Sequence, residues 1–181
     1  MVNRIWHSVV LRSSEHFVAQ PSGDGHSFRG VVVLPIDNQP GHISYQVQLD
    51  AGWRTRRADI EAASAGTHTR IEIVADATGA WECNGEALSA LSGCVDVDLG
   101  WTPATNTLQI RRLGLHVGAR QTVDVAWLRF PELTLERSRQ TYERLGDTTW
   151  RFSSDGFTAV LEVDDFGYVL RYGENLWTTV V

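Results

Sequence analysis

The stretch DVDLGWTPATNTLQIRRLG, residues 96–114, concentrates polar side chains beside an apolar strand. Alternation of apolar and polar residues at its start predicts a strand that carries Asp96 and Asp98 on one face. A short helix after it would return amide and guanidinium groups toward these carboxylates, and such groups together can recognise the hydroxyls of a sugar. The candidate ligand-binding residues of this stretch are Asp96, Asp98, Trp101, Thr105, Asn106, Arg111 and Arg112.

The same groups have other possible uses. Paired arginines and aspartates could lock the helix onto the sheet as structural ion pairs, or the acids could form a solvated strand face. Asp96 and Asp98 could also serve a hydrolase, because retaining glycosidases hold two carboxyls about 5–5.5 Å apart. Without an apolar environment that raises one pKa, however, two such acids are more often solvated than catalytic. We therefore predict no catalytic residue, and a non-catalytic role is the preferred interpretation.

A second polar cluster, GWRTRR, follows a DAG turn signal. Strand alternation would place Arg54 and Arg56 on one face, with Thr55 and Arg57 on the other. Trp53 could stack on the apolar face of a sugar while Arg54 and Arg56 bind hydroxyls or phosphate. The alternative is an edge strand that its charges keep from pairing with neighbours. The sequence leaves open whether the two polar clusters meet in space.

Alternation with a period of two dominates the rest of the chain and predicts strands at residues 43–49, 95–99, 123–128, 160–163 and 169–172. The ambiguous stretch 136–145 is assigned as strand. Turn signals fall between the strands, as is typical of antiparallel hairpins; they begin at Pro40, Asp50, Asp76, Asn84, Asp155 and Asp164.

The one helix that the pattern supports lies inside the polar stretch. Thr105 or Asn106 can cap its start, residues 108–112 form its body, and Gly114 is placed to end it. Residues 1–181 are therefore predicted to form one mainly β, antiparallel domain with one or two short helices.

Composition excludes several classes of function. The net charge is −6 over 181 residues, which disfavours a nucleic-acid binder. No apolar run approaches the roughly 18 residues of a membrane span, and the first residues do not resemble a secretory signal. Cys83 and Cys94 lack metal-binding or redox spacing, so a cytoplasmic protein with reduced thiols is expected. The histidines are scattered and no phosphate or dinucleotide loop occurs, so no metal or cofactor is predicted.

Four segments, GWRTRRADIE, GCVDVDLGWTPATNTLQIRRLGL, VAWLRFPELTLE and GFTAVLEVDDFGYVLRYGENLW, resemble in the same order a bacterial family described as putative glycolipid-binding, formerly of unknown function. The similarity spans nearly the whole chain. It implies one strongly curved antiparallel sheet, a spiral β-roll or half-barrel similar in architecture to the carriers of lipoprotein acyl chains. It carries over no catalytic residue.

The combined expectation is non-catalytic binding of a small amphipathic ligand, a glycolipid or a related lipid. Apolar strand faces would line a groove for its acyl chains, and the two polar clusters would meet its head group. Two alternatives stay open: a carbohydrate-active hydrolase that uses Asp96 and Asp98, and a scaffold whose sheet edges pair with a protein partner. Replacing both acids by Asn would abolish turnover in the enzyme but only lower affinity in the carrier. Ligand identity, pathway and oligomeric state are not encoded in any recognisable pattern.

Overall fold

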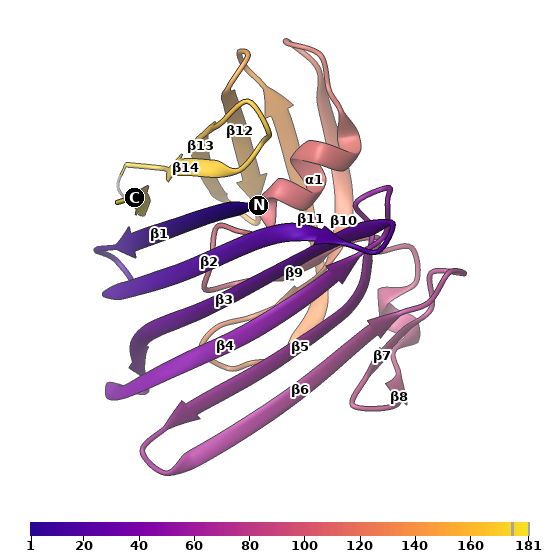
Figure 1. Ribbon diagram of the computed structural model, residues 1–181. Helices are drawn as coiled ribbons and strands as arrows, with labels where there is room; N and C mark the ends of the chain where they lie inside the picture. Colours follow the sequence, from indigo (N-terminus) through magenta and orange to yellow (C-terminus); the bar gives the residue numbers. More distant parts are fainter. Residues whose placement is uncertain (175, 181) are drawn as a thin grey trace.

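The computed structural model describes residues 1–174 and 176–180, and in this part of the chain fifteen strands form a single sheet (Figure 1). The strands are β1 (Val2–Ser8), β2 (Ser13–Ser22), β3 (Gly25–Ile36), β4 (Gln39–Leu49), β5 (Thr55–Ser64), β6 (Thr67–Ala75), β7 (Trp81–Cys83), β8 (Glu86–Ala87), β9 (Val97–Leu99), β10 (Arg120–Leu128), β11 (Leu135–Arg144), β12 (Thr149–Ser154), β13 (Phe157–Val163), β14 (Val169–Tyr172) and β15 (Trp177–Thr179). A 3₁₀ turn, η1 (Ser89–Leu91), precedes β9, and the helix α1 (Asn106–Leu113) follows it.

The sheet has two arms that meet where the first and last strands pair. Its order is β8-β7-β6-β5-β4-β3-β2-β1-β15-β14-β13-β12-β11-β10-β9, and neighbours are antiparallel except for the parallel pair β9 and β10. Its outermost strands are therefore β8 and β9, of two and three residues. Edges this short offer little backbone to a partner strand, which weakens the case for a scaffold that works by edge pairing.

Burial alternates along the strands because one face of the sheet packs inward. On β3, Phe28, Val32 and Leu34 are buried while Arg29, Val31 and Val33 are exposed. On β4, buried residues alternate with half-buried or exposed ones. The helix α1 packs into the same core through Leu108 and Ile110. In Figure 1, β1–β6 form one broad layer, β10–β13 rise behind it, and α1 lies between the two. The mainly β, curved, antiparallel prediction is confirmed.

Most element predictions are also confirmed. The strands expected at residues 43–49, 123–128 and 160–163 lie within β4, β10 and β13, the strand at 169–172 coincides with β14, and the ambiguous stretch is β11. The helix ends at Gly114, which has the predicted left-handed conformation (φ 53°). No helix in the described residues is both long enough and apolar enough to cross a membrane.

Three local predictions are wrong for identifiable reasons. The turn predicted at Pro40 occurs at Asp37 and Asn38, whose short polar side chains tolerate φ angles of 49° and 60°. Pro40 is the second residue of β4 and pairs with Pro35. The strand predicted at residues 95–99 is shorter, covering only Val97–Leu99. Thr105 occupies the cap position of α1 but caps nothing, because its hydroxyl bonds elsewhere.

A β-bulge overturns the predicted facing of the GWRTRR cluster. The register between β4 and β5 shifts at Gln48/Leu49, so Thr55 pairs with Leu49 and Arg57 with Gln48. Thr55 is buried, whereas Arg57 reaches Asp59 on the same strand. Thr55 and Arg57 therefore do not share a face.

Candidate ligand-binding site

The two polar clusters singled out in the sequence do meet in space. The backbone N–H of Val97 donates to Oγ1 of Thr55 at 2.9 Å, which joins β9 to the start of β5. The guanidinium carbon of Arg111 lies 5.0 Å from the ring centroid of Trp53. The contact answers the question that the sequence left open, but the polar side chains do not gather at one rim.

Asp96 and Arg112 form a buried ion pair that joins α1 to the residue directly before β9. Arg112 donates through Nε to both carboxylate oxygens, at 3.1 and 3.0 Å, and through Nη2 to Oδ2 at 2.5 Å. The Asp96 side chain is fully buried and that of Arg112 is 17% exposed. Burial raises the pKa of Asp96, and Arg112 opposes that rise. These two residues therefore adopt the structural ion-pair role, and Asp96 is not available as the second acid of a hydrolase.

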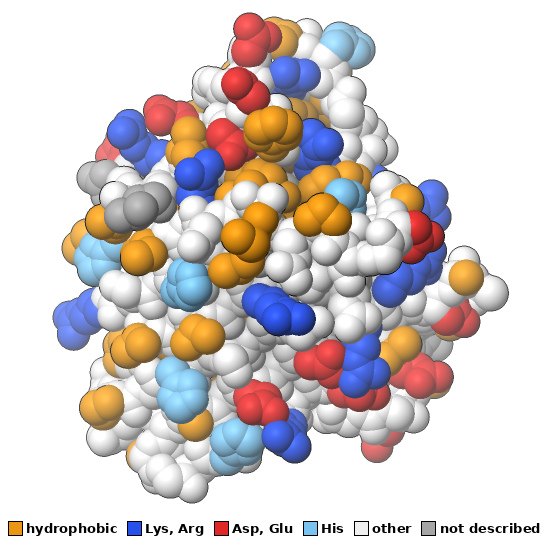
Figure 2. Space-filling model, viewed as in Figure 1, with side chains coloured by type: hydrophobic (Ala, Val, Ile, Leu, Met, Phe, Trp, Pro, Cys, Tyr) orange, Lys and Arg blue, Asp and Glu red, His pale blue; other side chains and the backbone are white. Residues whose placement is uncertain are grey.

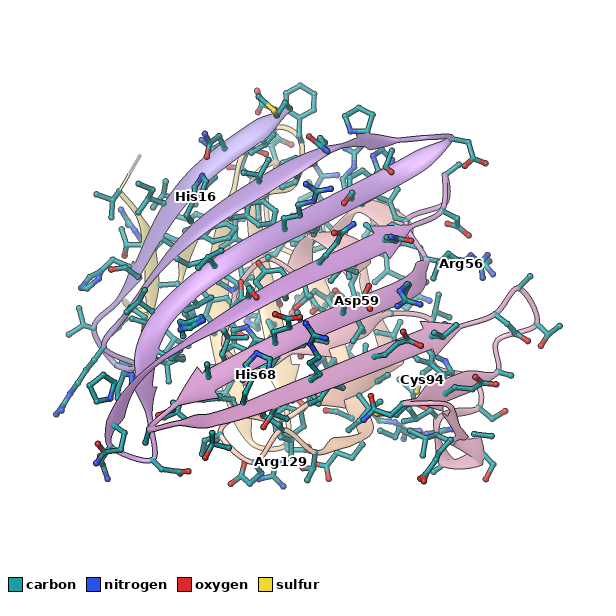
Figure 3. All side chains as sticks on the ribbon, turned by 60° about the horizontal axis from the view of Figure 1, so that its bottom comes forward. His16, Arg56, Asp59, His68, Cys94 and Arg129 are labelled. Carbon is teal, nitrogen blue, oxygen red and sulfur yellow. The ribbon has the colours of Figure 1, made fainter. Side chains whose placement is uncertain are left out.

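Arg54 and Arg56 lie at a separate place, beside a depression of about 240 Å³ that Cys94 also lines. Figure 3 shows Arg56 and Cys94 toward the same end of the sheet. Arg56 donates to Oδ2 of Asp50 at 2.6 Å and to the carbonyl oxygen of Asp76 at 2.8 Å. These bonds secure two loops, so the fork of Arg56 is occupied within the protein.

Asp98 and Asn106 line a cleft of about 310 Å³ between the first turn of α1 and the arm formed by β9–β15. This cleft combines seven polar residues, five aromatic residues and three small or aliphatic ones. Its polar lining is Asp98, Thr102, Asn106, Ser138, Gln140, Ser154 and Asp155. The other lining residues are Leu99, Gly100, Trp127, Phe152, Phe157, Tyr172, Leu176 and Trp177. Its size falls at the lower end of the roughly 300–1,000 Å³ typical of ligand pockets.

A hydrogen-bond network fixes the polar floor of the cleft. Asp98 accepts from Oγ1 of Thr105 at 2.7 Å and from Nε2 of Gln140 at 2.7 Å. The Tyr142 hydroxyl lies 3.0 Å from Oδ1 of Asn106 and 3.2 Å from Oε1 of Gln140, so its one proton is shared between two acceptors. Burial raises the pKa of Asp98, while both donors favour its charged form. The network holds each carboxylate and amide in one orientation.

Aromatic rings form the walls above this floor. Phe157 and Tyr172 stack with centroids 6.3 Å apart and planes inclined by 13°, and Phe152 contacts Phe157 at 6.2 Å. Phe157 stands at the rim with 46% of its surface exposed. Among the described lining residues there are two carboxylates and no arginine or histidine. Such a surface accepts hydrogen bonds from hydroxyls, packs against the apolar faces of rings and repels anions.

The chain is similar to known proteins over all the elements that form this cleft. The family model described as putative glycolipid-binding matches residues 3–178. The chain belongs to this family. The crystal structure of a DUF1089 family protein from Pseudomonas aeruginosa is similar, with a TM-score of 0.78 and 30% identity over 89% of this chain and 90% of that one. No curated protein matches the sequence.

In this member of the putative glycolipid-binding family, Trp101 does not line the cleft, although the sequence predicted a ligand contact there. Its ring is fully buried and meets Phe130 edge-on, with centroids 6.3 Å apart. Thr105 is buried as well, and its hydroxyl donates to Asp98 and accepts from the backbone N–H of Leu99, both of which line the cleft. Neither Trp101 nor Thr105 is part of the cleft lining.

A buried acid that was not predicted from the sequence, Glu15, is bonded to Thr102 in the cleft wall. Glu15, 1% exposed, accepts from the Tyr45 hydroxyl at 2.5 Å and from Oγ1 of Thr102 at 2.9 Å, through the same oxygen. Burial raises the pKa of Glu15 to about 8. The ring of Tyr45 lies across Gly30, where a Cβ would stand 2.2 Å from it. The signal was present in the sequence, since Glu15 alternates in phase with the buried residue Phe17.

The remaining predicted residues, Trp53 and Arg111, line a different hollow near the last turn of α1. Of the ten predicted ligand residues, the cleft thus contains Asp98 and Asn106 directly. Its aromatic walls were not predicted, because β12–β15 supply most of them from residues far along the chain. Among the described residues, no cluster of three or more His, Cys, Asp or Glu side chains could hold a metal ion.

Proposed function

We propose that the protein binds a neutral, sugar-headed lipid in the cleft and does not act on it chemically. The observation that carries the proposal is a floor of one oriented acid and one oriented amide, Asp98 and Gln140, beneath aromatic walls, with no arginine among the described lining residues. Sugar hydroxyls are donors that a carboxylate satisfies, and a sugar's C–H face packs on aromatic rings. Phe157 and Leu176 would meet the first carbons of the alkyl chain.

A binding role is supported over hydrolysis by the state of the acids. Hydrolysis of a glycosidic bond needs two carboxyls on opposite sides of the scissile bond. Asp96, the predicted partner of Asp98, is bound by Arg112 and is not part of the cleft lining. The remaining acid, Asp155, is exposed on the hairpin turn between β12 and β13. The family description points to the same ligand class.

Calorimetric titration with octyl glucoside, below its micelle concentration, tests the proposal. Octyl glucoside should bind saturably, and Phe157→Ala should weaken it about fivefold because one ring contact is lost. Phe166→Ala is the matched control: Phe166 is 66% exposed and does not line the cleft, so affinity should not change.

Two further arms can contradict the proposal. Aromatic rings beside carboxylates also bind quaternary ammonium groups. If octyltrimethylammonium binds more tightly than octyl glucoside, the ligand of the cleft is a cationic amphiphile and not a sugar-headed lipid. If the native protein releases glucose from octyl glucoside and the Asp98→Asn variant does not, the protein is a hydrolase. Lower affinity without any turnover in Asp98→Asn is the result expected of a carrier.

A further inference from the structure

Near the last turn of α1, a second hollow of about 410 Å³ opens between β1–β3, the Trp53 loop and the β13–β14 turn. Most of its lining is apolar or aromatic. The lining residues are Met1, Val2, Ala19, Gln20, Pro21, His26, Trp53, Arg111, Phe166 and Tyr168. In Figure 2, hydrophobic side chains gather around the place where Figure 1 marks the N-terminus beside α1. None of the lining residues is shared with the cleft.

Arg111 places a fixed positive charge in this hollow. Its guanidinium lies over Trp53 at 5.0 Å, and its stem passes Gly167 so closely that a Cβ there would stand 3.2 Å from Cδ of Arg111. Within residues 1–174 and 176–180, the guanidinium has neither an ion pair nor a hydrogen-bond partner. The nearby Asp164 is occupied, because it accepts from Arg4 and from the turn amides of Phe166 and Tyr168.

The walls around Arg111 are held in place before any ligand arrives. Trp53 has a left-handed backbone (φ 66°), which is unfavourable for a bulky side chain. The Asp50 loop holds it there, since the N–H of Trp53 donates to the Asp50 carbonyl at 3.0 Å and the Asp50 carboxylate accepts from Gly52 and Arg54. His26 stacks on the Trp53 ring at 4.0 Å. Strain maintained by a dedicated loop is typical of binding sites.

Arg111 is the one charged side chain among the described residues that line the hollow. Burial, and then the neighbouring Arg111, lower the pKa of His26, so His26 is largely neutral near pH 7 and can donate one hydrogen bond. No lining residue in the described chain is a carboxylate that could neutralise Arg111. A guanidinium fork that is already immobilised binds a carboxylate or a phosphate with little further loss of entropy.

We propose that this hollow is a second binding site, specific for an anionic amphiphile. Its carboxylate or phosphate is bound by the fork of Arg111, and its alkyl chain or ring lies against Trp53 and Phe166. This goes beyond the proposed function, because the ligand differs in charge from the one assigned to the cleft and contacts different residues. The two sites can therefore be occupied, and can fail, independently.

Fluorine NMR of protein labelled with 5-fluorotryptophan tests this proposal site by site. The chain has seven tryptophans, and the variants Trp53→Phe, Trp127→Phe and Trp177→Phe assign one resonance to the hollow and two to the cleft. Octyl phosphate should shift the Trp53 resonance saturably and leave those of Trp127 and Trp177 unchanged. Arg111→Gln should weaken octyl phosphate at least about tenfold, as expected for loss of a charge-assisted bidentate contact.

Arg29→Gln is the matched control, since Arg29 is exposed on the opposite face of β3 and its loss should change nothing. Arg111→Lys, which keeps the charge but not the planar fork, should weaken binding less than Arg111→Gln. Unchanged tryptophan resonances other than that of position 53 verify the fold of each variant. The proposal is overturned if Trp53 does not respond, if Arg111→Gln binds normally, or if inorganic phosphate or octyl glucoside matches octyl phosphate at Trp53. Failure of the proposed function would appear separately, at Trp127 and Trp177.

Discussion

The cleft and the hollow lie near opposite ends of the same eight-residue helix, and their linings are opposite in charge. Asn106, the first residue of α1, lines the cleft together with two carboxylates, whereas Arg111, in the last turn, lines the hollow. A cation in the last turn is favoured by the helix dipole and so costs the fold little. The comparison shows that one short helix contributes to two linings of opposite charge, because the strands around each end supply different side chains.

The largest expected effect is on stability and comes from Glu15, a buried acid that bonds to Thr102 in the cleft wall. Among the described residues that line the hollow there is no acid. A carboxyl with a raised folded-state pKa binds its proton more tightly in the folded state. The contribution of Glu15 to the free energy of unfolding should therefore be largest below pH 4.5 and fall by up to about 5 kcal/mol as the pH rises toward 8. Urea denaturation at several pH values measures this fall.

Glu15→Gln is the control for that prediction, because it preserves the acceptor for Tyr45 and Thr102 but cannot ionise. Its stability should vary far less between pH 4.5 and 8. A variant with the same pH dependence as the native protein would show that Glu15 is not the titrating group.

Arg112→Met should be the next largest change, since it leaves Asp96 charged and buried without a partner. We expect a loss of about 3 kcal/mol in the free energy of unfolding, and weaker binding at both sites because α1 positions Asn106 and Arg111 alike. Adding Asp96→Asn should recover part of the stability by removing the unpaired charge. Loss of binding at the cleft alone would mean that α1 does not couple the two regions.

Two glycines allow a matched comparison of the turns beside each region. Gly167 (φ 84°) borders the hollow, and a Cβ there would lie 3.0 Å from Ile110, whereas Gly156 (φ 83°), on the turn beside the cleft, has open space around it. Gly156→Ala should cost about 1 kcal/mol through backbone strain alone. Gly167→Ala should cost more and weaken octyl phosphate, because the turn must move away from Arg111. Equal thermal destabilisation by both substitutions would contradict this packing.

Salt should have the smallest effect. Raising the salt concentration to about 1 M shortens the Debye length to about 3 Å. Octyl phosphate should then bind about two- to threefold more weakly, while octyl glucoside, which carries no charge, should not weaken. Calorimetry of both ligands at low and high salt measures the difference. If salt lowers the affinity for octyl glucoside as much as that for octyl phosphate, the cleft and the hollow do not differ in their electrostatics.

Much of the fold could be predicted from the sequence because it rests on local patterns. The alternation in residues 43–49 and 169–172, and the glycine after Leu113, specify strands and a helix end without reference to distant residues. The bulge at Gln48/Leu49 could not be read this way, since it depends on how β4 and β5 pair, and it reversed the facing expected for Arg57.

The candidate site was only partly predictable for a related reason. Asp98 and Asn106 were found because strand and helix lie close together in the sequence. For Asp96 the sequence left open a structural ion pair, a solvated strand face, ligand binding and catalysis, and the buried bond to Arg112 favours the ion pair. Phe152, Phe157 and Trp177 come from strands that follow β11 in the chain, and the successive pairing of β11 to β15 places them beside Asp98 and Asn106. No local pattern encodes how that arm curves over the start of α1.

The most direct test of the central claim is a crystal structure of the protein with octyl glucoside. The account predicts the glucose ring inside the cleft, with one of its hydroxyls donating to Asp98, its C–H face against an aromatic wall, and the alkyl chain leaving past Phe157. A glucose ring bound in the hollow beside Arg111, or outside both sites, would contradict it.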